Sequence, residues 1–559
     1  MNDIVENFNS FFVNVGPDLA AEIPECSNNE MESLIDINSK TMFLSGVTET
    51  EIIDVINGCK NKASTDCFDI DMTLVKQIIH SIVKPLTYIC NLSFQTGTVP
   101  NKMKIAKVIP IHKNGNKHIF TNYRPVSLLP QFSKILEKLY NSRMDNFIDK
   151  HKLINEGQYG FRAARSTSMA IIDAIEEITN SLEGKKHAAG IFIDLKKAFD
   201  TLNHSILLKK LDRYGIRGVA LSWIQSYLTG RQQYVKMGEF TSGYLDIGCG
   251  VPQGSVLGPK LFNLYINDIC NVSKLLKLVI FADDTNVFYS NDNYSNLVTN
   301  INCELRKLKT WMDINKLSLN LNKTKVMFFG NYNGKPDSVN IDGVVLDTVS
   351  GIKFLGVIID SKLSWKPHIR HIQGKVSKSI SIINKAKFFL NYNALFLLYS
   401  SLVLPYLNYC VEVWGNNYKS SLHPLVILQK RAVRIIHKVG YYDHTNILFL
   451  QSKLLKMHDL VDFSTAQLLF KANKNVLPAR IQMLFARTEG GYNLRGCDNF
   501  KTQAVSSTRK SMFVSVCGVK LWNKLGQNIN NVQIFIISNQ DIKKWYGQST
   551  RRRKWVLDC

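Results

Sequence analysis

The chain has 559 residues, a formal net charge of +24 and an apolar content of 45%. This composition excludes wholesale disorder and allows about three or four domains of roughly 150 residues each. The basic excess favours a polyanionic partner; the alternatives are a solvated basic surface or binding to a membrane surface. The 11 cysteines form no CxxC motif and no Cys/His cluster. A zinc knuckle and a disulfide framework are therefore excluded, and a reduced intracellular compartment is expected.

Residues 1–100 are predicted to form a helical N-terminal extension. Apolar residues recur with helical spacing from Val47 to Ile56, behind Thr48, and again from Ile70 to Leu92. The N-terminus carries acidic residues and no apolar run, so it is not a signal peptide.

Residues 101–360 change character, because short β-rich apolar runs alternate there with helical segments. The run Ala188–Ile193 is typical of a buried strand, and it ends in Asp194. A helical pattern follows. Asp200, six residues after Asp194, is predicted to cap that helix rather than to take part in catalysis.

The segment Leu276–Tyr289 has two apolar, β-rich halves around Asp283 and Asp284. It predicts a hairpin with both carboxylates at its tip, although an ordinary Asp-rich turn explains this segment alone equally well. Together with Asp194, three acidic groups can converge, and such a cluster repels itself unless cations bind between the charges. Two Mg²⁺ ions could activate an attacking 3′-oxygen and stabilise leaving pyrophosphate there.

A loop rich in glycine and proline, Gly250–Pro259, lies between these acidic elements and contains Gln253. Its glycines allow a backbone to approach a substrate closely, whereas in isolation the segment could be a simple turn.

The last third of the chain is predicted to comprise a helical domain, residues 361–440, and a basic C-terminal region, residues 441–559. Ser361–Cys559 contains 30 basic and 8 acidic residues, a net charge of +22, which leaves +2 for the preceding residues. Phe388–Val411 has no charged residue and is long enough to span a bilayer. Polar residues and Pro405 interrupt it, so a buried helix pair is predicted instead.

The acidic elements belong to a series of segments that resembles the reverse transcriptases of non-LTR retrotransposons, particularly the jockey-like elements. Eight segments occur in the order of the family and are together far more specific than any one of them. They are Lys107–Lys113, Asn122–Leu129, Gln158–Arg162, Phe192–Asp200, Val251–Ser255, Phe281–Asp284, Leu319–Lys325 and Phe354–Val357. Similarity to the jockey-like thumb and tail continues through Pro405–Cys410, Trp414–Gly415 and Leu428–Ala432.

The resemblance implies an α/β (α+β) right-hand polymerase fold, with fingers and palm in residues 101–360 and a helical thumb in residues 361–440. It implies an RNA-directed DNA polymerase that copies RNA into cDNA from a primer 3′-OH with two Mg²⁺ ions. The expected partners are an RNA template, a DNA primer or target and dNTPs, with no membrane.

The resemblance also assigns roles to residues. Asp194, Asp283 and Asp284 would hold the metal ions. Arg124 and Lys113 would grip the triphosphate, because a guanidinium fork and an ammonium group suit phosphate oxygens; without the motif, both are solvated surface charges.

Four further residues receive roles in the same way. Phe199 would exclude a 2′-OH, or it is a plain core aromatic. Gln253 and Gly254 would form the nucleotide pocket. Lys323 would protonate pyrophosphate, although Lys325 is close in sequence.

The chain departs from the family in its flanks. Intact elements carry an endonuclease-like domain before the polymerase, and the hundred residues preceding the motifs are too short for it, so endonuclease activity is expected to be supplied elsewhere or lost. A catalytically silent nucleic-acid-binding remnant is the alternative. A viral RNA-dependent RNA polymerase is disfavoured by Ala282 and Phe199, where those enzymes have glycine and a polar residue. Nuclear localisation with a cytoplasmic ribonucleoprotein phase is expected, and Arg551–Lys554 is either a nuclear-localisation patch or a disordered basic tail.

Overall fold

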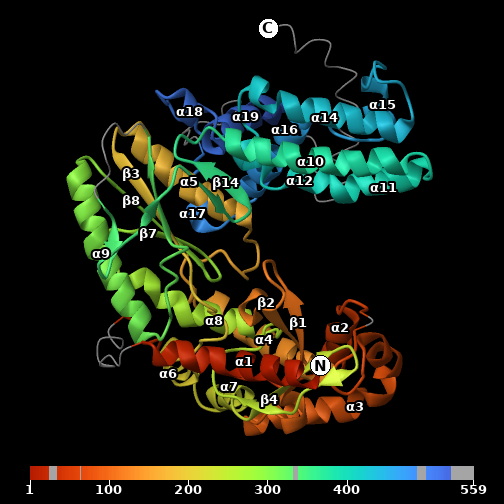
Figure 1. Ribbon diagram of the computed structural model, residues 1–559. Coiled ribbons are helices and arrows are strands. Elements are labelled where there is room, and N and C mark those ends of the chain that lie inside the picture. Colours follow the sequence, from red (N-terminus) through yellow and green to blue (C-terminus); the bar gives the residue numbers. More distant parts are fainter. Residues whose placement is uncertain (24–33, 63, 331–337, 488–498, 530–559) are drawn as a thin grey trace.

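The computed structural model describes residues 1–23, 34–62, 64–330, 338–487 and 499–529. The predicted basic patch Arg551–Lys554 lies outside the described residues. The architecture is mixed α/β, as predicted, with two main sheets and a largely helical last third (Figure 1).

The described part of the first hundred residues contains helices α1 (Asn2–Ala21), α2 (Glu49–Asn57) and α3 (Met72–Thr96). Thr48 begins α2, because its side chain accepts a hydrogen bond from the Glu51 N–H, as the sequence pattern predicted. Helix α1 packs on the first sheet through Phe8, whose ring lies edge-on to Phe120 and Tyr123.

The first sheet contains a hairpin whose end carries Lys113 and Arg124, the residues predicted to bind the triphosphate. Its strands are β1 (Ile105–His112), β2 (Tyr123–Leu128), β4 (Arg231–Met237), β5 (Phe240–Thr241) and β6 (Leu245–Ile247). Their order is β2-β1-β4-β5, with β6 also pairing with β4. Ile111 of β1 pairs with Arg124 of β2, and the Lys113 N–H donates to the Asn122 carbonyl. Lys113 and Arg124 therefore lie at the same end of this hairpin.

The central sheet carries the predicted carboxylates. Its strands are β3 (His187–Ile193), β7 (Lys277–Phe281), β8 (Asp284–Asn291), β9 (Lys325–Phe329) and β12 (Asp347–Thr348), in the order β12-β9-β3-β8-β7. Strand β3 is antiparallel to both of its neighbours. Ala189 and Ile191 face one hydrophobic core and Ala188 and Phe192 face another, because successive side chains of a strand point to opposite faces. Both faces of β3 are covered, as its uninterrupted apolar run predicted.

Helices cover the two faces of the central sheet. The core on the first face is shared with α4 (Gln131–Lys150), α6 (His204–Tyr214), α7 (Val219–Leu228), α8 (Gly258–Ile266) and α9 (Tyr294–Ile314). The second face packs on α5 (Thr167–Glu183). Figure 1 shows the sheet between α9 and α5. Two small hairpins follow, β10 (Asn340–Ile341) with β11 (Val344–Val345) and β13 (Gly351–Phe354) with β14 (Val357–Asp360).

The last third packs on α5 and shares its core. Its helices are α10 (Lys366–Ala386), α11 (Tyr392–Leu402), α12 (Leu404–Asn408), α13 (Val411–Trp414), α14 (Lys419–His437), α15 (Asn446–Gln451), α16 (Met457–Asn473), α17 (Ala479–Gln482), α18 (Thr508–Ser511) and α19 (Val519–Ile529). One hydrophobic core contains buried residues of α5, α10, α14 and α16. In the described residues, the predicted helical domain (residues 361–440) and the predicted C-terminal region (residues 441–559) thus contribute to the same core.

The charge-free segment Phe388–Val411 forms the predicted helix pair, α11 and α12. Only its inner face is buried, however: Leu395 is fully buried, whereas Phe389 and Leu397 are 89% and 67% exposed. The prediction of a buried pair is wrong for the outer face, because each helix packs on its neighbours along one side only. No helix in the described part of the chain has the length and apolar character needed to cross a bilayer.

Candidate active site

The three predicted carboxylates lie at neighbouring strand ends of the central sheet. Asp194 directly follows β3, and Asp283 and Asp284 form the end of the β7–β8 turn. Ile193 pairs with Thr285 across β3 and β8, so the next residue, Asp194, comes alongside Asp284. The sheet register therefore brings together acidic groups that are 89 residues apart in the sequence.

The carboxylates of this cluster repel one another, and only Lys323 lies within ion-pair distance of them among the described residues. Asp283 and Asp284 are exposed, yet the surrounding protein partly desolvates them; this desolvation, followed by the charges of Asp283 and Asp194, raises the pKa of Asp284 to about 6. Desolvation is also the main cause of the raised pKa of Asp283; the charge of Asp194 adds to it, and the charges of Arg124 and Lys113 partly offset it. Carboxylates that raise one another's pKa values are poised to bind a cation, because an ion placed between them removes the repulsion.

The donor set fits a hard divalent metal ion in kind, although the side chains are not arranged around one. Among the described residues, no group of three or more His, Cys, Asp or Glu side chains is placed to hold a metal ion as it stands. The Asn320 side-chain amide donates to Asp194 Oδ2 over 2.9 Å, and Lys323 Nζ lies 3.9 Å from the same oxygen. Both contacts are made to Oδ2, so Oδ1 of Asp194 is the oxygen that would remain for a metal ion.

Two lysines close in sequence are separated by the fold. Lys323 is 71% exposed and faces Asp194. Lys325 lies in β9 and forms an ion pair with Asp347 over 2.5 Å, directed away from the carboxylates along the β9–β12 pair. Lys323 is therefore the one of the two lysines that lies beside the carboxylates, and its role as a proton donor stays a prediction.

A group of positive charges adjoins the carboxylates. Burial lowers the pKa of Lys113, and the charges of Arg124, Lys197 and Lys323 lower it further. None of Lys113, Arg124 and Lys197 has an acidic group within ion-pair distance among the described residues. The predicted pair Lys113 and Arg124 is thus brought to the site, and Lys197 joins it although sequence reasoning did not single it out.

The prediction that Asp200 caps a helix is wrong. Asn203 begins α6, because its side chain accepts from the Ile206 N–H over 3.1 Å. Asp200 Oδ1 instead accepts a hydrogen bond from Gln253 Nε2 over 2.8 Å. Its Oδ2 is buried and has no hydrogen-bond partner among the described residues, and burial raises the pKa of this carboxyl. The capping prediction failed because the chain continues through a turn for three more residues before the helix begins.

The loop that contains Gln253 is held on the hairpin strand that carries Arg124. The Ser127 N–H donates to the Gln253 carbonyl over 2.9 Å. Gly254 has φ +126°, and a Cβ placed on it would lie 2.7 Å from the Ser127 carbonyl oxygen. Only glycine fits this position. Gly254 is therefore explained by the close approach to β2, and its contact with a nucleotide stays a prediction.

Comparison with known proteins shows which family the site region resembles. Residues 111–359 match the family described as reverse transcriptase (RNA-dependent DNA polymerase), and they include all nine predicted site residues. Residues 111–359 are thus similar to a reverse transcriptase domain. It is 28% identical over 431 residues to the RNA-directed DNA polymerase from mobile element jockey of Drosophila melanogaster, covering 74% of this chain and 46% of that protein.

Other relatives agree with the jockey-like resemblance. The probable RNA-directed DNA polymerase from transposon BS of Drosophila melanogaster is 27% identical over 413 residues, covering 70% of this chain and 45% of that protein. The probable RNA-directed DNA polymerase from transposon X-element of the same species is 26% identical over 417 residues, covering 73% and 46%. The chain thus spans about half the length of the curated relatives it matches, and its resemblance to non-LTR retrotransposon reverse transcriptases is confirmed.

Within residues 111–359, Phe199 is partly buried and stacks on Phe262 with ring centroids 4.6 Å apart. Phe161 lies edge-on to it at 6.5 Å. Both interpretations are compatible with this packing, because one part of the ring contributes to the core and another part is accessible. Exclusion of a 2′-OH by Phe199 stays a prediction.

Two supports of the site were not assigned from the sequence. Gln158 Oε1 accepts from the Ala282 N–H over 3.1 Å and so holds the turn next to Asp283. Helix α1 contacts the backbone at Asp200 closely, because a Cβ on Gly16 would lie 2.2 Å from the Asp200 carbonyl oxygen. The motif Gln158–Arg162 gave a signal for the first support, whereas nothing in the sequence pairs α1 with residues 111–359.

Proposed function

We propose that the chain is an RNA-directed DNA polymerase of a non-LTR retrotransposon, which extends a primer 3′-OH on an RNA template with dNTPs and two Mg²⁺ ions. The observation that carries this proposal is the convergence of Asp194, Asp283 and Asp284 at adjacent strand ends, opposite an unpaired group of positive charges. This combination suits a reaction in which metal-bound triphosphate reacts with a primer hydroxyl.

We propose that the regions of the chain form the parts of a right hand. We assign the central sheet with α5, α6, α8 and α9 to the palm, and the β1–β2 hairpin with its sheet to the fingers. The helices α10, α11, α12 and α14 then form the thumb. Under this assignment the carboxylates of the palm lie near the cations of the fingers.

Each side chain has a defined task under the proposal. Asp194, Asp283 and Asp284 would hold the ions, which would lower the pKa of the primer hydroxyl and neutralise charge on the leaving pyrophosphate. Lys113 and Arg124 would bind the triphosphate oxygens. Lys323, beside Asp194 and exposed, would donate a proton to pyrophosphate.

Primer extension on poly(rA)/oligo(dT) tests the proposal, with Asp283→Asn as the matched inactive variant. We expect dTTP incorporation that requires Mg²⁺, is abolished by a chelator and is absent from the variant. Absence of extension by well-folded wild-type protein that still binds the hybrid would leave a catalytically silent nucleic-acid-binding remnant. A preference for UTP over dTTP would instead indicate an RNA polymerase and remove the assigned role of Phe199.

A further inference from the structure

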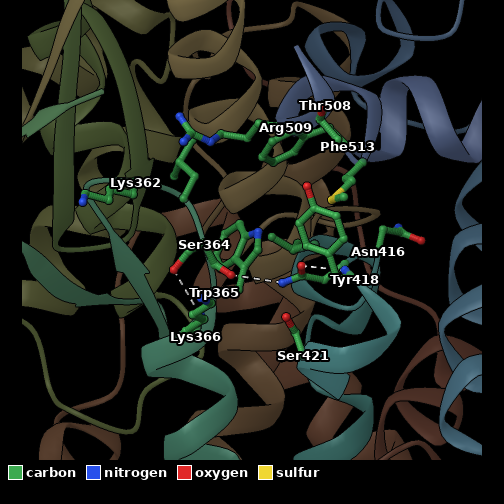
Figure 2. A pocket seen from close by; sticks show the side chains of 14 residues that line it. Lys362, Ser364, Trp365, Lys366, Asn416, Tyr418, Ser421, Thr508, Arg509 and Phe513 are labelled. Atoms are coloured by element: carbon green, nitrogen blue, oxygen red, sulfur yellow. Dashed lines mark hydrogen bonds between the residues drawn. The ribbon is translucent and has the colours of Figure 1, made fainter. Parts of the chain in front are cut away.

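A second pocket lies outside the candidate active site and has a different chemistry. It has a volume of about 360 Å³ and is formed by the loop between β14 and α10, the start of α14, and helix α18. Figure 2 shows Tyr418 within it, with Arg509 on one side and Lys366 on the opposite side. The volume is within the range of small-ligand sites, ~300–1,000 Å³.

Positive charge dominates the lining of this pocket. Lys362, Lys366 and Arg509 are exposed, none has an ion pair among the described residues, and no aspartate or glutamate lines the cavity. The nearby Asp360 forms no ion pair with them among the described residues, and its carboxylate accepts the backbone N–H groups of Ser364 and Trp365. Three uncompensated cations around one concave space indicate an anionic ligand.

Backbone dipoles add to this potential. The 21-residue α10 and the 19-residue α14 both begin at the pocket, and their first flanking residues, Trp365 and Tyr418, form no side-chain capping bond. The N-terminal end of a helix carries partial positive charge, which favours anions such as phosphate. The dipoles support the site defined by the cavity and its cations and would not define one alone.

The pocket also offers an aromatic surface on a rigid base. Tyr418 is 56% exposed, whereas Trp365 beside it is 4% exposed and belongs to the core. The Asn417 side-chain amide donates to the Ser364 carbonyl over 3.1 Å and joins the two segments that form the base (Figure 2). An exposed tyrosine ring beside unpaired cations is the combination with which proteins bind single strands, by stacking a base and pairing the phosphates.

We propose that this pocket binds single-stranded RNA, with a base stacked on Tyr418 and the adjoining phosphates on Lys362, Lys366 and Arg509. The pocket contains none of the carboxylates or cations of the active site, so it can hold a strand while a primer–template hybrid occupies the polymerase cleft. Its position between the hairpin β13–β14 and the basic last third would keep an RNA strand attached to the protein. This proposal does not require the protein to be catalytically active.

The test is binding of a fluorescent oligouridylate to the full-length protein in the presence of a saturating, unlabelled RNA–DNA hybrid. We expect wild-type protein to bind both ligands together. In the variant Lys362→Gln/Lys366→Gln/Arg509→Gln, the slope of log affinity against log salt should decrease in magnitude by about 2, because each single-strand phosphate contact contributes roughly 0.7. The variant Tyr418→Ala should weaken binding about tenfold and leave the salt slope unchanged.

A matched control separates the pocket from general charge. Lys60→Gln/Lys84→Gln/Lys209→Gln removes the same charge at exposed lysines without ion pairs among the described residues, and it should leave the slope unchanged. Photocrosslinking of 4-thiouridine RNA to a peptide containing Tyr418 would support the site directly. Competitive displacement of the oligouridylate by the hybrid, or equal slopes for the two triple variants, would overturn the proposal. Hybrid binding, measured separately, reports on the polymerase cleft and does not depend on this outcome.

Discussion

Two acidic clusters lie beside the central sheet, and they differ in whether cationic side chains form ion pairs with them. On α5, Glu176 forms a buried ion pair with Lys510, and Asp173 is paired with Lys277 over 2.8 Å and with Arg480 over 3.3 Å. Lys510 and Arg480 come from the C-terminal region, more than 300 residues away in the sequence. These acids are neutralised by side chains of the protein itself and attach the C-terminal region to the sheet.

At the other cluster the acids remain uncompensated. The only cation within 4 Å of any of the three carboxylates, among the described residues, is Lys323, which is 3.9 Å from Asp194 and largely exposed. The pKa of Asp284 is raised to about 6 by desolvation in the surrounding protein and by the charges of Asp283 and Asp194, although the residue is exposed. Acidic residues alone therefore do not define a functional site. Acidic residues that the fold brings together without ion-pair partners do indicate one, because their mutual repulsion lowers stability and no ion pair offsets it.

The largest expected effect is that of Asp283→Asn. The amide has the same shape but cannot supply the negative charge for a metal ion, so kcat should fall by at least about a thousandfold, equivalent to ~4 kcal/mol. The melting temperature should be unchanged or slightly higher, because the substitution relieves repulsion from Asp194. Steady-state primer extension and differential scanning fluorimetry measure the two effects.

The matched substitution on α5 is Asp173→Asn, which should have the reverse outcome. Activity per folded molecule should be retained, and the melting temperature should decrease, because Lys277 and Arg480 lose their ion pairs with Asp173, although Lys277 keeps Glu177 as a partner. A stable but inactive Asp173→Asn protein would remove the distinction between the two clusters.

Lys510→Met tests the compensated cluster most directly. The Lys510 and Glu176 side chains are 2% and 4% exposed, and removal of one partner leaves a buried, unpaired carboxylate. We expect a loss of about 3–5 kcal/mol in the free energy of unfolding, measured by urea denaturation. The double variant Lys510→Met/Glu176→Leu should recover most of it. A loss below about 1 kcal/mol would show that this pair does not hold the C-terminal region in place.

Prediction from the sequence succeeded where local pattern determines structure. The apolar run before Asp194 predicts a buried strand, and the two β-rich halves around Asp283 and Asp284 predict a hairpin. The order of the eight motifs supplied the family, and through it the site residues of residues 111–359. The proximity of Lys113 and Arg124 to the carboxylates also follows from the motifs.

Contacts between distant segments could not be predicted in this way. The pairing of Glu176 with Lys510 depends on how the C-terminal helices pack on α5, and no local spacing encodes it. The close backbone contact between Gly16 and Asp200 depends on the path of α1 across the first sheet. The bond from Gln253 to Asp200 requires two motifs to meet in space, so the sequence suggested a helix cap instead.

The two lysines of the β9 region extend the comparison to cations. Lys323→Gln should reduce kcat about a hundredfold, because it removes the proposed general acid, and should leave stability unchanged since the side chain is exposed. Lys325→Gln should leave kcat unchanged and cost at most about 1 kcal/mol, through its ion pair with Asp347. Single-turnover extension resolves the chemical step. A larger loss of kcat in Lys325→Gln would reverse the assignment that the structure makes.

The smallest effect is expected at Asp200, which belongs to neither class of acid. It lies near the active-site cations, yet its Oδ1 accepts from Gln253 and its pKa is raised by burial. Asp200→Asn retains the acceptor, so kcat/KM for dTTP should stay within about threefold of wild type. Asp200→Leu should lower it about tenfold, because a buried donor on Gln253 loses its partner at a cost of ~1–3 kcal/mol. The asparagine substitution thus separates the two kinds of acid: it abolishes activity where a charge is required, as at Asp283, and is tolerated where only a hydrogen bond is required. A hundredfold loss in Asp200→Asn would place Asp200 among the residues that act through their charge.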